Sequence, residues 1–142
     1  MKMRKLVPVT ASAFAIALVL AGCTVTGPTE NFSGLPDEEK LVDELEGGDE
    51  AVQVFWMHEG AQIGVAISGS SGCPIIGNDI KVIAPEGEGN TVEIITNTIP
   101  ADKLCTMDFV PHTSVFWTPA NVSTAEPLTV RVQGEDLTLD VK

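Results

Sequence analysis

The chain has few of the residues on which several common functions depend. Its 142 residues include no tyrosine and only two histidines, so few side chains are suited to acid–base catalysis near neutral pH. Lysine and arginine total 8 against 20 aspartates and glutamates, and the formal net charge is −12. This excess of acid argues against nucleic acid as a partner, and against electrostatic adhesion to anionic lipid or wall polymer.

Long apolar runs are also absent. The longest apolar-rich stretch is Val7 to Leu20, interrupted only by Pro8, Thr10 and Ser12. At about 14 residues it falls short of the roughly 20 that a transmembrane helix needs. Three basic residues precede it. A basic start followed by an apolar run of this length is typical of a secretory signal peptide.

The sequence Leu20-Ala21-Gly22-Cys23 follows this run directly. It resembles the lipobox of bacterial lipoproteins at every position. The resemblance implies transfer of a diacylglyceryl group to the Cys23 thiol, followed by cleavage of the chain before Cys23. Two or more acyl chains such as palmitate, at about 0.8 kcal/mol per buried CH₂, hold a protein firmly at a membrane. We therefore expect an extracytoplasmic protein anchored to the cell membrane through its N-terminal lipid.

Composition divides the chain into three parts. Residues 1–22 are expected to be the signal peptide, residues 23–50 the lipidated N-terminus with an acidic flexible tether, and residues 51–142 the folded domain. Removing residues 1–22 takes away three of the 8 basic residues and no acid, which leaves a formal charge of −15. The tether carries nine acids and one base, Lys40, and such a composition does not bury enough surface to fold alone.

The tether contains one stretch with a helical pattern, residues 37–46. Asp37 is suited to cap this helix, acids fill its first turn, and Gly47 ends it. Three apolar side chains share one face and offer a docking strip. Because an isolated helix of this length is marginal, a fraying helix in a solvated tether is the preferred interpretation.

Residues 51–142 consist of short β-type segments separated by turn residues. About seven such strands, without a convincing helix, predict an all-β fold with the architecture of an antiparallel β-sandwich, for which we expect an immunoglobulin-like topology. The eight candidate segments for these strands are Val52–His58, Gln62–Ile67, Asp79–Ala84, Thr91–Thr96, Lys103–Val110, Thr113–Thr118, Leu128–Val132 and Leu137–Val141.

Two pairs of adjacent aromatic residues lie in the expected strands, Phe55-Trp56 and Phe116-Trp117. Neighbours in a strand face opposite sides of the sheet, so both members of a pair cannot enter one core. One large ring is therefore either exposed as a binding patch or covered by another element. We expect coverage, because large rings are mostly buried.

Cys73 and Cys105 remain after processing at Cys23. An even pair of cysteines in a small exported domain predicts a disulfide bond, and closing a loop of about 33 residues contributes roughly 3–4 kcal/mol. The turn at Cys73-Pro74 and the later Pro111-His112 are also similar to segments in small uncharacterised lipoproteins of high-GC Gram-positive bacteria. That resemblance implies no particular activity.

Copper binding is a second hypothesis. The types of His58, Cys105, Met107 and His112 match the two histidines, one cysteine and weak methionine of a cupredoxin-like copper or redox protein. The order differs, because no methionine follows His112, and Cys73 competes for Cys105. We therefore expect no metal and no cofactor, and keep His58, Cys105 and His112 as the candidate ligands.

A small cell-surface hydrolase is a third hypothesis. Asp108 and His112 are spaced to share a strand face with a nearby serine, as a catalytic triad requires. The serine-rich stretch at residues 68–72 lacks the G-x-S-x-G spacing of a nucleophile turn. The leading hypothesis is therefore a non-catalytic β-sandwich that binds or supports an envelope protein or ligand.

Overall fold

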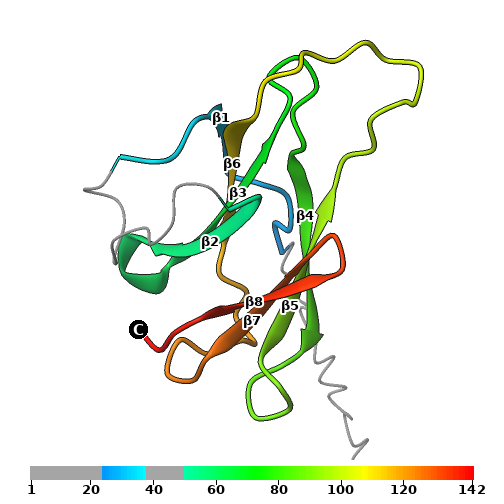
Figure 1. The fold of residues 1–142 in the computed structure, drawn as a ribbon. Coiled ribbons are helices and arrows are strands. Elements are labelled where there is room, and N and C mark those ends of the chain that lie inside the picture. The colour runs from blue at the N-terminus through cyan, green and yellow to red at the C-terminus, as the bar shows by residue number, and fades with distance from the viewer. Residues whose placement is uncertain (1–23, 38–49) are drawn as a thin grey trace, which may run out of the picture.

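The computed structural model describes residues 24–37 and 50–142, which form two β-sheets packed against each other (Figure 1). The first sheet has the strand order β1–β6–β3–β2 and the second has the order β4–β5–β7–β8. The strands are β1 (Glu30–Ser33), β2 (Val52–Met57), β3 (Gln62–Gly69), β4 (Gly77–Ala84), β5 (Thr91–Thr96), β6 (Val110–Trp117), β7 (Leu128–Val132) and β8 (Glu135–Leu139). The all-β fold and its sandwich architecture are confirmed.

The pairing of strands differs between the two sheets. Every pair in the first sheet is antiparallel. In the second sheet β4–β5 and β7–β8 are antiparallel, but β5 and β7 run parallel, with Thr91 opposite Thr129. The second sheet is therefore mixed. The immunoglobulin-like topology stays a prediction, because this parallel pair departs from the antiparallel sheets on which it was based.

The N-terminal described segment belongs to the sandwich. The Thr26 carbonyl accepts a hydrogen bond from the Ile80 N–H at 2.9 Å, on β4. Three residues later the Thr29 N–H donates to the Val115 carbonyl at 2.7 Å, on β6, and β1 continues this pairing. The chain thus passes from one sheet to the other.

The predicted tether at residues 23–50 is therefore wrong for residues 26–33. Strand β1 is held by backbone hydrogen bonds, which an acidic composition neither reveals nor prevents. Cys23 and residues 38–46 of the predicted helix lie outside the described residues. The lipidation site and that helix therefore stay predictions.

The predicted strand at Lys103–Val110 is also wrong. Residues 97–109 form a loop between β5 and β6, and β6 begins at Val110 and includes Pro111. Proline has no N–H to donate to the neighbouring β1 segment. The Gly34 carbonyl there accepts a hydrogen bond from the Thr113 hydroxyl at 2.6 Å, while the Gly34 N–H donates to the Pro111 carbonyl at 2.8 Å. A side chain thus supplies a donor where proline has none.

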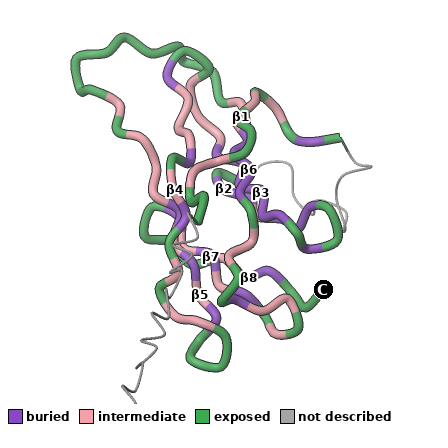
Figure 2. Tube along the Cα trace, turned by 180° about the vertical axis from the view of Figure 1, so that it is seen from behind, coloured by how far each residue is buried: buried purple, intermediate pink, exposed green. Residues whose placement is uncertain are grey.

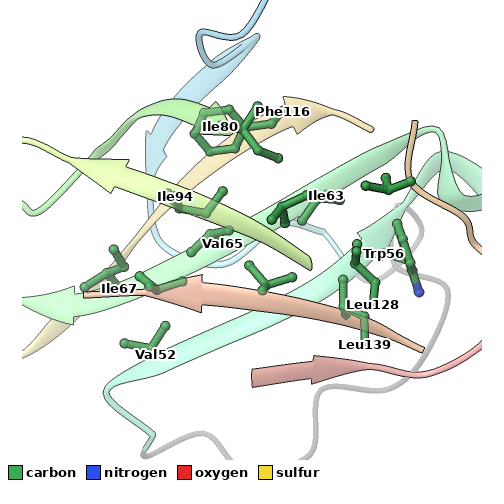
Figure 3. Packing of buried hydrophobic residues seen from close by; sticks show 14 residues of the cluster. Val52, Trp56, Ile63, Val65, Ile67, Ile80, Ile94, Phe116, Leu128 and Leu139 are labelled. Carbon is green, nitrogen blue, oxygen red and sulfur yellow. The ribbon is translucent and has the colours of Figure 1, made fainter. Parts of the chain in front are cut away.

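The core lies between the sheets and is built from alternate residues of the strands (Figure 3). Phe116 is fully buried in it beside Ile80, and Trp56 enters it from β2. Trp117 faces the other way and is 52% exposed. Phe55 is buried on the opposite face of β2 from Trp56, in a smaller cluster with Met57. The expected coverage of both pairs is thus wrong for one ring, that of Trp117.

Candidate interaction site

A disulfide bond joins the loop at residues 97–109 to the turn that follows β3. Cys73 and Cys105 are bonded with their Cα atoms 5.4 Å apart, as the cysteine count predicts. Cys73 is buried at the base of the turn, whereas Cys105 is exposed in the loop. The bond therefore fastens an exposed segment to the sandwich.

Thr106 provides a second attachment next to the disulfide. Its hydroxyl oxygen lies 2.8 Å from the Ser70 hydroxyl and accepts a hydrogen bond from the Gly72 N–H at 3.0 Å. The same hydroxyl donates to the Asp108 carboxylate, which also accepts the Ser71 N–H at 3.0 Å. The segment from Cys105 to Asp108 is thereby held against residues 70–73 by one covalent bond and several hydrogen bonds.

These hydrogen bonds stabilise the charged form of Asp108. Donation by Ser71, and then by Thr106, lowers the pKa of this carboxyl from 3.8 to about 2. Because the pKa is lower in the folded state, the attachment is strongest above pH 3.8 and weakens as the pH falls toward 2. Asp108 therefore stays ionised at neutral pH.

We expect Asp108→Asn to release this attachment at neutral pH, because an amide accepts the Ser71 and Thr106 donors less well than a carboxylate. The protection of the Ser71 N–H from hydrogen exchange, relative to the intrinsic rate at the same pH, should fall in the variant and, in the unmodified protein, between pH 4 and pH 2. Asp136→Asn is the matched control, because Asp136 is also an exposed acid of lowered pKa, paired with Arg131 in the β7–β8 hairpin. If neither Asp108→Asn nor acid changes the protection of the Ser71 N–H, the Asp108 carboxylate does not hold the loop as described.

The attached loop presents three large apolar side chains to solvent. Leu104 is 96% exposed, Met107 is fully exposed and Phe109 is 63% exposed. Figure 2 shows this part of the loop as a continuous exposed stretch beyond the sandwich. We refer to Leu104, Met107 and Phe109 as the apolar crest. Exposed apolar residues grouped in this way are typical of interaction sites, whereas single ones are common on any surface.

The apolar crest lies at the end of the sandwich opposite to Thr24, the first residue that the structure describes. Its loop begins beside the start of β4, where the Asn97 N–H donates to the Ile76 carbonyl at 3.0 Å. Thr26 pairs with Ile80, and Gly27 lies beside Asn78, so Thr24 is directed toward the other end of β4. Eight strand residues span roughly 25 Å. The described chain therefore begins at the end of β4 opposite to the crest.

The candidate copper ligands do not come together. The sulfur of Cys105 is bonded to Cys73 and is not a thiolate. His112 pairs with Ile67 on β3, whereas His58 follows β2 at the level of Gln62. Five strand residues separate these levels, about 17 Å, whereas metal–ligand bonds are close to 2 Å. Within residues 24–37 and 50–142 no three histidine, cysteine, aspartate or glutamate side chains form a metal-binding group.

The candidate triad is not assembled either. Asp108 is bonded to Ser71 and Thr106, and among the described residues no hydrogen bond joins it to His112. The His112 Nε2 atom is buried without a hydrogen-bond partner there, and burial lowers the pKa of this imidazole. Ser70 and Ser71 line a pocket of about 160 Å³ with His112. A triad requires the acid to orient the histidine, and this acid instead attaches the loop.

Comparison with models of protein families, with curated proteins and with solved structures finds no match for this chain. Across the part of the chain that the structure describes, no helix has the length and apolar character needed to cross a membrane.

Proposed function

We propose that this protein is a non-catalytic binding module, anchored outside the cytoplasm by lipid on Cys23, that binds an envelope protein through the apolar crest. The main support is that a disulfide and the Thr106 hydrogen bonds fix a loop in which the side chains of Leu104 and Met107 are almost completely exposed to solvent. Exposing such side chains is unfavourable in the free protein. Burial against a partner recovers that free energy, and a loop that is already attached loses little entropy on binding.

The partner class follows from position and charge. The crest lies at the opposite end of the sandwich from Thr24, so an anchor at Cys23 directs it away from the anchoring membrane. The formal charge of −15 after processing opposes contact with anionic lipid. A protein with an apolar pocket bordered by basic residues complements both the crest and the net negative charge of this protein.

A photo-crosslinking experiment tests this proposal in cells that produce the full chain. Benzoylphenylalanine at position 101, an exposed site in the same loop, is expected to form a discrete product with one envelope protein. Replacing Leu104, Met107 and Phe109 together by serine should lower the yield at least about 10-fold, because buried apolar anchors carry most interface energy. The result that overturns the proposal is an unchanged yield in this triple variant.

Two controls separate binding from other effects. Replacing Ile83 and Val141 by serine removes exposed apolar side chains at other positions and should leave the product unchanged. Cys23→Ser should leave the protein without its acyl chains, measured as intact mass, and should not weaken binding of the isolated partner. Absence of acyl mass from the unmodified protein would contradict the lipid anchor and leave the proposal for the crest standing.

A further inference from the structure

A groove runs between the edge strands of the two sheets, away from the apolar crest. Strand β2 ends the first sheet and β8 ends the second, and residues 50–56 and 135–140 line a space of about 940 Å³ between them. The strands converge at one end, where the Trp56 indole N–H donates to the Asp140 carbonyl at 2.9 Å. The groove is thus bordered by two strand edges and bounded at one end by a hydrogen bond.

The backbone of β2 has the geometry of a template for another strand. The Ser68 N–H donates to the Ala51 carbonyl at 2.8 Å, and the register continues from Val52 opposite Ile67. In an antiparallel pair the hydrogen-bonded residues alternate, so Val52, Val54 and Trp56 direct their N–H and C=O groups away from β3. These groups repeat at the spacing of a strand and face the groove. Such an edge pairs readily with an added strand.

Strand β8 offers a second, shorter edge across the groove. The β7–β8 turn has positive φ angles of 52° at Gln133 and 84° at Gly134, and Val132 pairs with Glu135. This two-residue turn makes Val132 and Glu135 a hydrogen-bonded pair, so the alternate residues Asp136 and Thr138 face outward. An extended chain in the groove therefore meets backbone donors and acceptors on both sides.

The charge of the groove defines what it binds. Four of its lining residues carry carboxylates, and none is lysine, arginine or histidine. The carboxylates belong to Glu50, Glu135, Asp136 and Asp140. Arg131 pairs with Asp136 at 2.7 Å and offsets one of these charges. The remaining negative charge favours a basic occupant and disfavours this chain's own residues 38–49, which contain six acids and one lysine. A second copy of this acidic chain is disfavoured for the same reason.

We propose that the β2–β8 groove accepts an extended basic peptide segment of another protein, which adds to the edge of β2 as a further strand. The backbone of β2 supplies the hydrogen bonds, and the carboxylates of Glu50, Glu135 and Asp140 select alternating lysine or arginine side chains. This site is separate from the apolar crest and does not depend on the function proposed for it.

The experiment measures binding of synthetic peptides to the full chain by NMR and calorimetry. The probe is an end-capped heptapeptide of alternating lysine and valine. It should bind with changes concentrated at the amides of Val52, Val54 and Trp56, and those amides should become protected from exchange. A glutamate–valine heptapeptide should bind at least about 10-fold more weakly. A lysine–valine peptide N-methylated at alternate residues keeps its charge but loses the pairing donors, and should also bind at least about 10-fold more weakly.

A variant of the protein tests the contribution of the carboxylates to binding without altering the backbone of β2. Glu50→Gln combined with Glu135→Gln should weaken binding of the lysine–valine peptide about 3- to 10-fold. The serine variant of the crest should bind this peptide as tightly as the unmodified protein does. Equal binding of the methylated and unmethylated peptides would overturn strand addition. Absence of binding at millimolar peptide, or changes located away from β2, would overturn the site itself.

Discussion

Phe116→Ala is expected to lower the free energy of unfolding by about 3–5 kcal/mol, because it removes the largest fully buried side chain of the core. The ring lies between the two sheets, and its Cζ atom is so close to Gly77 that a Cβ atom there would approach to 2.6 Å. Because the structure around a truncated core side chain relaxes only in part, a cavity remains. Urea denaturation followed by tryptophan fluorescence measures the change.

Trp117→Ala is the matched control for this prediction. Trp117 is the next residue of β6, is also a large aromatic residue, and is 52% exposed on the other side of the sheet. Its replacement by alanine should lower the free energy of unfolding by less than about 1 kcal/mol, because much of the Trp117 ring is already exposed to solvent. Equal destabilisation by the two substitutions would contradict the assignment of Phe116 to the inter-sheet core.

Removing the disulfide has the second largest expected effect. Replacing Cys73 and Cys105 by serine should lower the free energy of unfolding by roughly 3–4 kcal/mol, because the bond closes a loop across a sequence separation of 32. The same change should weaken crosslinking at position 101. The Thr106 hydrogen bonds alone then hold the apolar crest, and the loop loses more conformational freedom on binding.

Reduction of the unmodified protein provides the control. A reductant should lower its stability toward that of the double serine variant and should leave the variant unchanged. Intact mass under non-reducing conditions should be two hydrogens below the full-thiol mass. A full-thiol mass with one tightly held copper would instead contradict the disulfide and restore Cys105 and His112 as a metal site.

Alternation in the sequence was sufficient to locate much of the sandwich. Strands β5 and β7 match the predicted ranges, and β2 and β3 differ from them only at their ends. These strands are buried on at least one face, so each must place apolar side chains at alternate positions. The disulfide was also predictable, because Cys73 and Cys105 are the two cysteines of the domain that was expected to be exported, and paired cysteines in exported domains usually form disulfides.

The segments that were predicted wrongly are those whose conformation depends on contacts with residues distant in the sequence. Lys103–Val110 places Cys105, Met107 and Phe109 at alternate positions, so its local pattern fits a strand, and only the tertiary structure shows that residues 97–109 form an exposed loop. Pro111 was expected to end a strand, but it lies inside β6. The Thr113 hydroxyl donates to the neighbouring Gly34 carbonyl, so this carbonyl has a donor although proline has no N–H. Strand β1 has little apolar surface and depends on backbone pairing with β6.

By itself, the sequence determined the all-β class, the alternating core positions, the pairing of Cys73 with Cys105 and the acidic charge, because the first two follow from local periodicity and the other two from residue counts. The tertiary structure decided the rest. It placed the apolar crest in water, separated His58 from His112, engaged Asp108 with Ser71 and aligned the edges of β2 and β8. These outcomes depend on contacts between residues distant in the chain, and local periodicity carries no information about which segments become neighbours.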